Sequence, residues 1–578
     1  MCGILGHLSS KAINKFEFEK DILKLQHRGP DDYGTFFDHG IALGHTRLSI
    51  IDLSNEGHQP MFSNCGNYII IYNGEIYNFG EIKKDLLIKG HVFNSNTDTE
   101  VILNGFLEYQ EKIVFKLEGM FAFSIYNKIT KQLFLARDRS GIKPLYYYKD
   151  SENFAYSSEI KTLKKYSSKV NLNSKILFLL LGYIPEPTTI YENIVMFPPG
   201  HYGYFKHNRL TIFEFDKYYF EQKILSPYDE IVSNVKELFQ KAIKKHLVSD
   251  ANIGTFLSGG LDSSAITAVV AKYKTNPSTL SLIFDEKDFS EEYYQDLISD
   301  RYSTRHTKYL VNEGLFIDNL EKFFTLMEQP TIDGLNTYFI SKAANDCGLA
   351  TVLSGLGADE IFHGYPSFRD AKTLKFLSKI PYSLIKIFEY SSKYKKIELV
   401  NAENELAYYL PRRAIFSPKE IANILNIDKL EIYNLIVELY KSYNSSMINE
   451  IEDKISHFEL NMYMKNQLLR DSDLFGMANS IEIRVPFLDK ELVDYILKIE
   501  PKEKVGKFNK QILVDCLKNI LPLEIINRKK KGFVLPYETW LRKNIGLFKI
   551  NENIKNDFLT KNVSWSKFWS LIVLEQFK

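Results

Sequence analysis

The sequence predicts two domains, an α+β domain built on sheets followed by an α/β domain with a parallel sheet and a helical C-terminal part. Three observations lead to this fold class. The chain has 578 residues, which is too many for one ordinary hydrophobic core. Roughly the first 210 residues are rich in short apolar runs that Gly, Asn, Asp and Pro interrupt. After residue 228, apolar strands alternate with helical stretches, as in a parallel sheet covered on both faces.

We expect the first domain to cover residues 1–212. Strands joined by turns are predicted for the runs HGIALGHTRLSIIDL, NYIIIYNGEIYN, MFAFSIYNK and KQLFLARDR. The stretches FEFEKDILKLQ and TEVILNGFLEY predict helices between these strands. The loop-rich segment PEPTTIYENIVMFPPGH closes the domain, and FDKYYFEQKILSPYDE connects it to the next one.

We expect the second domain over residues 228–578. It begins with the helical stretch DEIVSNVKELFQKAIKKHL, which leads into the apolar strand IGTFL. SAITAVVAKY continues as a helix, and STLSLIF and LATVLSG predict further buried strands. Beyond residue 370 the chain is rich in Lys, Glu, Leu and Ile, which predicts a mainly helical C-terminal part.

Composition and charge exclude several classes of protein. The chain is 45% hydrophobic and 25% charged, close to the globular average, and its net charge of +1 gives no electrostatic argument for nucleic acid or an anionic membrane. The longest apolar run, ILFLLLGYIP, is too short to span a bilayer, and the charged KAINKFEFEK stands where a secretory signal has its apolar region. The four cysteines are scattered and show no metal-ligand spacing. We therefore expect a cytoplasmic protein with neither a nucleic-acid nor a membrane partner.

The loop SGGLDSS, residues 258–264, is the strongest local signal in the sequence. It joins an apolar strand to a helix that begins near Asp262. Its glycines allow close approach of a ligand, its serines add hydroxyl donors, and the helix N-terminus favours phosphate oxygens. It is not a Walker A loop, because the GK[ST] ending is absent. The alternative is an ordinary Gly/Ser turn between strand and helix.

A second glycine-rich loop, SGLGADE at residues 354–360, follows another apolar strand. Ligands of open α/β sheets collect at the carboxyl ends of the strands, so both loops are expected to face one site. Asp262 and Asp359 are then predicted ligands of a Mg²⁺ ion that bridges ATP phosphates. For Asp359 alone, a helix N-cap is the other interpretation.

Taken together, these motifs resemble the glutamine-hydrolysing asparagine synthetase family. SGGLDSS is similar to the pyrophosphate loop of ATP-pyrophosphatases, and MCGI, HRGPDD, YNGEIYN and RVPFLD complete a pattern that runs along nearly the whole chain. The resemblance implies a class II glutamine amidotransferase domain, which is an N-terminal nucleophile (Ntn) hydrolase-like layered sandwich, followed by an ATP-pyrophosphatase domain. It further implies glutamine, ATP with Mg²⁺, a carboxylate acceptor and a homodimer.

Cys2 is the nucleophile that the resemblance implies, exposed when Met1 is removed. Its α-amine, with a pKa of roughly 7.7–8, can take the thiol proton and later return a proton to ammonia. A buried structural cysteine is the alternative. By the same resemblance, glutamine-binding residues are Arg47, Asn73, Gly74, Glu75 and Asp98, with Asn73 and Gly74 as oxyanion donors. Read alone, NG predicts a hairpin turn. HRGPDD is expected to be a structural and gating loop without chemistry of its own.

The resemblance also assigns the ATP site. The predicted contacts are Leu257, Ser258, Gly259, Gly260, Asp262, Ser263, Ile283, Ser354, Gly355 and Lys530. Lys530 is the best match to the family's pyrophosphate-binding lysine, although Lys529, Lys531 and a solvated lysine face stay open. Asp471, Glu482 and Arg484 are predicted polar contacts in the synthetase cleft, with a salt-bridged scaffold as the alternative.

Two positions depart from the family's pattern. The third residue of SGxGxDE is usually a carboxylate and is Leu356 here, and FHGY places His363 where the family has FGGY. The predicted reaction is glutamine-dependent, AMP-forming amide synthesis with aspartate as the favoured acceptor. Another carboxylate stays open, such as a uronic acid of a surface polysaccharide precursor. A glutamine or nucleotide sensor is disfavoured because it would not need Cys2, Asn73 and both aspartates. Two sites also imply an internal passage for ammonia.

Overall fold

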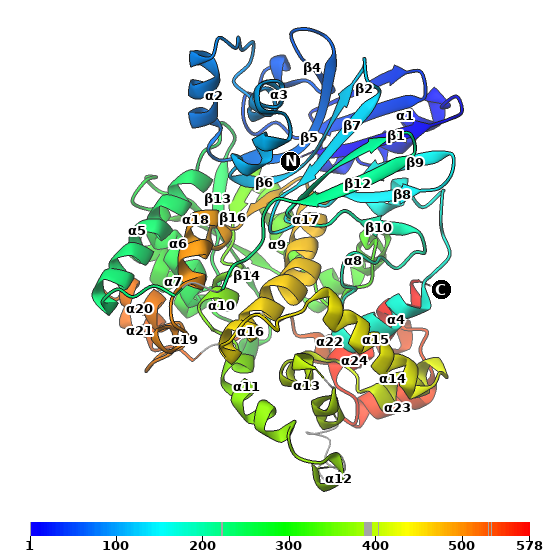
Figure 1. Cartoon of the computed structure of the whole chain (residues 1–578). Helices are drawn as coiled ribbons and strands as arrows, with labels where there is room; N and C mark the ends of the chain where they lie inside the picture. The colour runs from blue at the N-terminus through cyan, green and yellow to red at the C-terminus, as the bar shows by residue number, and fades with distance from the viewer. Residues whose placement is uncertain are drawn as a thin grey trace.

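The computed structural model describes residues 2–220, 223–385, 396–402, 404–529, 531–532 and 534–577. Two six-stranded antiparallel sheets form its N-terminal part, and a five-stranded parallel sheet lies in the part that follows. Figure 1 shows the antiparallel sheets in blue and cyan at the top, above the helices of the second half. The predicted order, an α+β part followed by an α/β part, is confirmed.

The two antiparallel sheets contain every strand run predicted in the first domain. The first sheet has the order β10-β8-β9-β1-β3-β2, with β1 (Gly3–Ser9), β2 (Asp32–Asp38), β3 (Ile41–Arg47), β8 (Tyr146–Lys149), β9 (Asn153–Ser157) and β10 (Ile194–Met196). The second has the order β12-β11-β7-β6-β5-β4, with β4 (Met61–Phe62), β5 (Tyr68–Ile76), β6 (Gly119–Asn127), β7 (Gln132–Arg137), β11 (His201–Lys206) and β12 (Arg209–Glu214).

Helices cover the outer faces of these sheets, so the N-terminal part has four layers. The helix α1 (Lys15–Leu23) packs on the first sheet, while α2 (Phe79–Ile88) and α3 (Asp98–Tyr109) pack on the second. Between the sheets lies an apolar core to which both contribute, for example through Leu43 and Leu135. A sheet with one apolar face must bury that face against another layer, and this sandwich does so on both sides.

The parallel sheet has the order β15-β14-β13-β16-β17, with β13 (Ile253–Phe256), β14 (Ser278–Ile283), β15 (Arg305–Leu310), β16 (Thr351–Leu353) and β17 (Glu482–Arg484). The chain builds outward from β13 in one direction and then returns to β16 on its other side. Such a reversal of strand order opens a crevice at the carboxyl ends of the two central strands. The loops SGGLDSS and SGLGADE follow these two strands.

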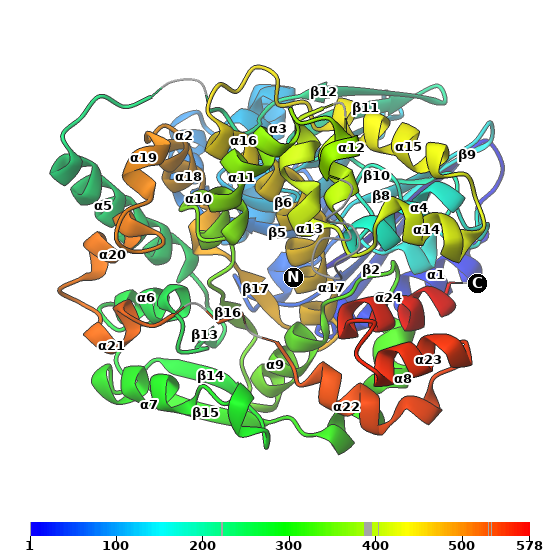
Figure 2. The same ribbon diagram turned by 90° about the horizontal axis from the view of Figure 1, so that it is seen from below.

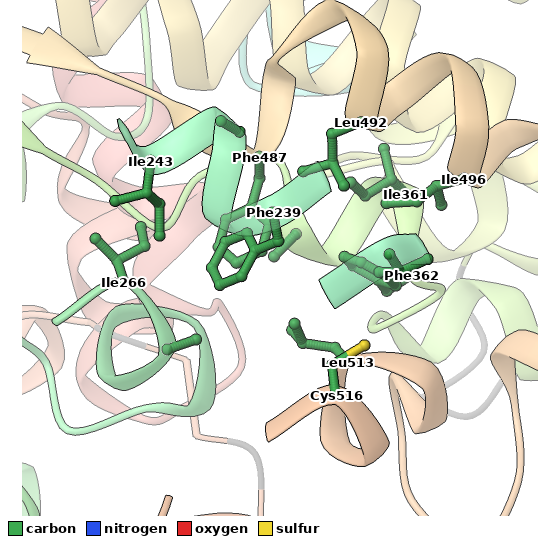
Figure 3. Packing of buried hydrophobic residues seen from close by; sticks show 14 of the residues in the cluster. Phe239, Ile243, Ile266, Ile361, Phe362, Phe487, Leu492, Ile496, Leu513 and Cys516 are labelled. Carbon is green, nitrogen blue, oxygen red and sulfur yellow. The ribbon is translucent and has the colours of Figure 1, made fainter. Parts of the chain in front are cut away.

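A large hydrophobic core packs against the strand end and the helix that flank the SGGLDSS loop, and Figure 3 shows part of this core. It joins α5 (Tyr228–His246), α6 (Leu261–Val270), α18 (Lys490–Leu497) and α20 (Gln511–Leu517). Phe239 and Phe487 stack with ring centroids 4.8 Å apart near its centre. Because close-packed aromatic and aliphatic side chains resist displacement, this core fixes where α6 begins and therefore where its N-terminal amides point.

The rest of the second half is mainly helical, as predicted. Its α-helices are α7 (Glu292–Arg301), α8 (Glu313–Leu326), α9 (Leu335–Asp346), α10 (Ala358–Ile361), α11 (Pro366–Leu377), α12 (Tyr382–Ile385), α13 (Leu410–Arg413), α14 (Pro418–Leu425), α15 (Lys429–Ser442), α16 (Ile451–Phe458), α17 (Arg470–Met477), α19 (Pro501–Lys504), α21 (Leu523–Ile526), α22 (Tyr537–Lys543), α23 (Glu552–Leu559) and α24 (Trp565–Glu575). A π-helix, η10 (Glu459–Leu469), joins α16 to α17. The apolar run ILFLLLGYIP begins within α4 (Leu172–Leu181). Across the described ranges, no helix has both the length and the apolar content that a membrane span needs.

Candidate active sites

Cys2 and Asn73 meet at the edge where the two antiparallel sheets face each other. The backbone N–H of Cys2 donates to Asn73 Oδ1 at 3.0 Å. Asn73 is fully buried, and its Nδ2 has no hydrogen-bond partner among the described residues. Burial raises the pKa of the Cys2 thiol, so the thiol needs a base to become a nucleophile. The arrangement therefore places a thiol beside a buried amide donor that is free to bind an oxyanion.

Asn73 and Gly74 lie inside β5 and not in a hairpin turn, so the turn interpretation of NG is wrong. In the strand register Gly74 faces Phe121 of β6. A Cβ on Gly74 would lie 2.2 Å from the carbonyl oxygen of Met120. Glycine is needed here because the neighbouring strand approaches closely, and not because a turn requires a left-handed residue.

Arg47 lies at the end of β3, close to Cys2. Gly3 pairs with Thr46, which makes Cys2 and Arg47 neighbours at the ends of β1 and β3. The guanidinium donates to the carbonyl oxygens of Ser54 at 2.7 Å and Asp52 at 2.5 Å. These two contacts fix its direction, and a fixed planar fork is suited to a carboxylate such as that of glutamine.

Glu75 and Asp98 are both buried near this site, and each has a pKa that burial raises. Asp98 accepts hydrogen bonds from Tyr72 Oη at 2.7 Å and the Ile76 N–H at 3.0 Å. Glu75 instead pairs with Arg484 of β17, with 3.2 Å between Oε2 and Nη2. One predicted glutamine ligand therefore already takes part in a contact with the second half of the chain.

Arg28 of HRGPDD is a site residue that sequence reasoning missed. It is fully buried, and its Nε donates to the backbone oxygen of Cys2 at 3.1 Å. Nη1 donates to Glu159 at 3.0 Å, and Nη2 lies 2.8 Å from Asp473 on α17. One guanidinium thus connects the Cys2 backbone with a helix of the second half. These contacts fit the structural part of the role that we expected for this loop.

The second candidate site is a cavity of about 1440 Å³ at the carboxyl ends of β13 and β16. Among the predicted ATP contacts, those that line it are Leu257, Ser258, Gly260, Asp262, Ser263, Ser354 and Gly355, and Asp359 lines it as well. Two predicted contacts are not part of the lining. These are Gly259, which has a φ of 72°, and Ile283, whereas Leu280, Ser281 and Leu282 of the same strand do line the cavity. The structure therefore brings both glycine-rich loops to one space.

Lys510 is the second residue that sequence reasoning missed. Its Nζ donates to both carboxylate oxygens of Asp262, at 2.7 and 2.6 Å, and lies 2.7 Å from Asp359 Oδ1. Its side chain is only 5% exposed. Burial alone would lower the pKa of Lys510, but the two carboxylates hold it above its ordinary value. The two predicted metal ligands therefore converge on one cationic position.

The lysine run near the end of the chain reaches the same cavity. Lys529 and Lys531 line it, whereas the predicted contact Lys530 lies outside the described residues. Arg528 also lines it, donates to the Gly259 carbonyl at 2.7 Å and stacks on Tyr294. This side of the loop thus has several cations that can face phosphate oxygens.

Carboxyl groups and tyrosines line the next part of the cavity. Leu356 lies there, so no carboxylate stands at the third position of SGLGADE. Burial raises the pKa of Glu360 to about 8 and that of Asp471 to about 6. Tyr463 and Gln467 reach the cavity from η10. π-Helical turns are rare in proteins, and those that do occur often lie at functional sites.

Glu482 and Arg484 do not line the cavity, in contrast to Asp471. Arg484 is fully buried, donates to Glu482 at 2.6 Å and pairs with Glu75 across the boundary between the two halves. The prediction that these two residues contact ligand in the synthetase cleft is therefore wrong. The scaffold alternative is correct for them, because one arginine compensates two buried carboxylates.

Two family models match the chain. One, described as "Glutamine amidotransferase domain", matches residues 1–219, and the other, described as "Asparagine synthase", matches residues 234–562. "Asparagine synthetase [glutamine-hydrolyzing] 1" of Bacillus subtilis (strain 168) is 32% identical, over 96% of this chain and 89% of the relative. "Asparagine synthetase [glutamine-hydrolyzing] 3" of the same organism is also 32% identical, over 92% and 87%. Among solved structures, glutamine phosphoribosylpyrophosphate amidotransferase of B. subtilis is 17% identical with a TM-score of 0.29, over 44% of this chain and 61% of that one.

Proposed function

The chain belongs to the glutamine-hydrolysing asparagine synthetase family, and we propose that it transfers the amide nitrogen of glutamine to aspartate in an ATP-dependent, AMP-forming reaction. The glutaminase domain is residues 1–212, and the synthetase domain is residues 228–578. The observation that carries the proposal is that one chain has two separate polar sites, one around Cys2 and one around Asp262. A reduced thiol and the use of ATP fit a cytoplasmic setting.

At the first site, Cys2 attacks the side-chain amide of glutamine once Met1 has been removed. The α-amine takes the thiol proton, which the burial-raised thiol pKa makes necessary. Asn73 Nδ2 and the Gly74 N–H stabilise the oxyanion, and Arg47 and Asp98 bind the glutamine carboxylate and amine. Collapse of the tetrahedral intermediate gives a glutamyl thioester and releases ammonia, and water then hydrolyses the thioester to glutamate.

At the second site, the acceptor carboxylate attacks the α-phosphorus of ATP, forming an acyl-adenylate and pyrophosphate. Ammonia then attacks the acyl carbon, and AMP leaves with the electron pair of the broken C–O bond. The SGGLDSS amides, Lys510 and Arg528 are placed to bind the pyrophosphate part of ATP. This assigns to Lys510 a role that the sequence assigned to Lys530.

Asp262 and Asp359 are suitable ligands for Mg²⁺. Both carboxylates lie within 2.7 Å of the same ammonium, so one cation can contact both, and the donors are all oxygen. The described residues contain no cluster of three or more acidic, His or Cys ligands, which fits a Mg²⁺ site that ATP phosphates complete. When bound, Mg²⁺ offsets the negative charge of the triphosphate.

Aspartate is the acceptor that the two named relatives support, and they do not favour the uronic acid that the sequence left open. The test is an assay of AMP formation with glutamine, ATP and Mg²⁺, with and without aspartate. We expect aspartate to increase AMP release and asparagine to accumulate in equal amount. AMP release that aspartate leaves unchanged would reject aspartate as the acceptor.

A further inference from the structure

The cavity that the SGGLDSS and SGLGADE loops line also has a part whose walls are basic. We call it the cationic lobe, and it is lined by Arg369, Lys396, Arg412, Arg413, Lys561 and Lys567. The helices α13 and α24, which contribute to it, lie to the right of α6 in Figure 2. The lobe thus belongs to a different side of the cavity from the SGGLDSS loop at the start of α6.

Tyr365 connects the lobe to the loop SGLGADE. Its hydroxyl donates to Glu360 Oε1 at 2.7 Å, and its ring lies 4.3 Å from the Arg413 guanidinium. The ring of Tyr463 also lies 4.0 Å from Arg413, and Glu459 accepts two hydrogen bonds from the same guanidinium. Glu459 therefore compensates the charge of Arg413, and the two tyrosine rings hold its guanidinium in place.

The lobe has more positive than negative charge. Arg412 pairs with Asp370 at 2.6 Å, and Lys567 contacts both oxygens of Glu420 at 2.6 Å. Within the described ranges, no carboxylate lies at ion-pair distance from Arg369, Lys396 or Lys561. Counted over the described part of the chain, the six cations of the lobe are paired with three carboxylates, which leaves an excess of three positive charges.

Lys396 is the half-buried member of this set. Its Nζ donates to the backbone oxygen of Ala414. Burial, together with the charges of Lys567 on α24 and Arg412 on α13, lowers the pKa of Lys396 to about 8, against the opposite effect of Glu420 on α14. An ammonium among like charges is unfavourable in the free protein, and an anion in the lobe would relieve that repulsion.

We propose that the cationic lobe is a binding site for a phosphate-bearing small molecule, distinct from the ATP site at the SGGLDSS loop. An excess of three charges suits a phosphate ester or diphosphate better than a single carboxylate, because a phosphate group carries up to two negative charges and several acceptor oxygens. The ligand is a separate effector, because aspartate, the proposed acceptor, carries no phosphate group. The inference rests on the proposed function only in placing ATP and acceptor elsewhere in the cavity.

The test is calorimetric binding of inorganic phosphate to the whole enzyme, with a non-hydrolysable ATP analogue and Mg²⁺ filling the nucleotide site. We expect phosphate to bind, and Lys396→Ala and Lys567→Ala each to weaken its affinity by about tenfold or more. Lys396→Arg should retain binding, because it keeps the charge. The matched control is Lys441→Ala, which removes an exposed lysine of α15 outside the cavity.

Glutamine hydrolysis at the distant Cys2 site shows whether each variant is folded. Affinity for phosphate that is absent, or equal in the lobe variants and Lys441→Ala, would overturn the proposal. We expect phosphate and aspartate to bind at the same time, and competition between them would place phosphate in the acceptor site and overturn the proposal. AMP formation with aspartate tests the proposed function independently, so either proposal can fail alone.

Discussion

Cys2 and its neighbours are the residues of the first proposed step, the attack on the glutamine amide. The contact of Cys2 with Asn73, and the unpartnered Nδ2 of that asparagine among the described residues, support the proposed roles of Cys2 as nucleophile and Asn73 as oxyanion donor. The same thiol is buried and has a raised pKa, so its reactivity depends on the α-amine. We therefore expect glutamine hydrolysis to depend both on the Cys2 thiol and on the removal of Met1, which exposes the α-amine.

Cys2→Ala is expected to reduce glutamine hydrolysis by about three orders of magnitude or more, because it removes the nucleophile. Synthesis from added ammonium chloride should persist, since ammonia enters the second site directly. Glutamate release and AMP release, measured in parallel, check this. Cys65→Ala is the control, because Cys65 is exposed. Equal loss of both activities in Cys2→Ala would contradict the two-site account.

The pH dependence of glutamine hydrolysis follows from the same pair of groups. The base must be the unprotonated α-amine, whose pKa is roughly 7.7–8, and the raised thiol pKa of Cys2 keeps the thiol protonated at neutral pH. We expect kcat/KM for glutamine to rise about tenfold per pH unit below that pKa and to level off above it. A profile that stays flat from pH 6 to 9 would show that another group is the base.

Asp262→Asn is expected to reduce AMP formation by about 100-fold or more, since it removes the charge of a proposed Mg²⁺ ligand. Glutamine hydrolysis should remain, because Cys2 lies in the other domain. Asp296→Asn, at a partly exposed ion pair with Lys308, is the matched control. Unchanged AMP release in Asp262→Asn would remove this residue from the ATP site.

Site residues could be predicted from the sequence when they belong to a short local motif. Cys2, Asn73 and the SGGLDSS loop belong to short motifs whose chemistry depends on adjacent residues. Lys510 was not predictable, because its partner Asp262 is 248 positions away and a lysine in GKFNKQ resembles any surface lysine. Arg28 was missed for the same reason, since its contact with Asp473 exists only in the folded chain.

Strand β17 is the element that joins the two halves. Its Arg484 pairs with Glu75 of β5 and Glu482 of its own strand, and all three side chains are buried. The prediction for LLRDSDLFGMANSIEIRVPFLD placed these charges in the ligand site, with a salt-bridged scaffold as the alternative, because a sequence cannot distinguish a buried structural ion pair from a binding group. Because they are buried at the boundary with the other domain, Glu482 and Arg484 are structural residues.

Arg484→Met is expected to lower the free energy of unfolding by about 3–5 kcal/mol, because two carboxylates lose the charge that compensates them. Urea denaturation followed by circular dichroism measures this. Lys441→Ala, at an exposed pair on α15, should change the same quantity little. A similar small change in both variants would show that the Arg484 network does not stabilise the fold.

In the whole molecule, the two halves of the chain meet at a boundary that buried ion pairs cross. Arg28 contacts Cys2 on one side and Asp473 on the other, and Arg484 makes a second crossing. The division into an antiparallel sandwich and a parallel sheet was predictable, because strand spacing and the alternation of strands with helices are local patterns. The position of one domain on the other was not, because it depends on these contacts between distant segments.

In the proposed reaction, nitrogen released at Cys2 is incorporated at the synthetase cavity of the same molecule. The most direct measurement is mass spectrometry of the product formed from glutamine labelled with ¹⁵N at its amide, together with aspartate, ATP and Mg²⁺. We expect asparagine that carries ¹⁵N, with one AMP for each molecule formed, even when unlabelled ammonium is added in moderate excess. Asparagine without the label, or no asparagine while glutamate accumulates, would contradict it.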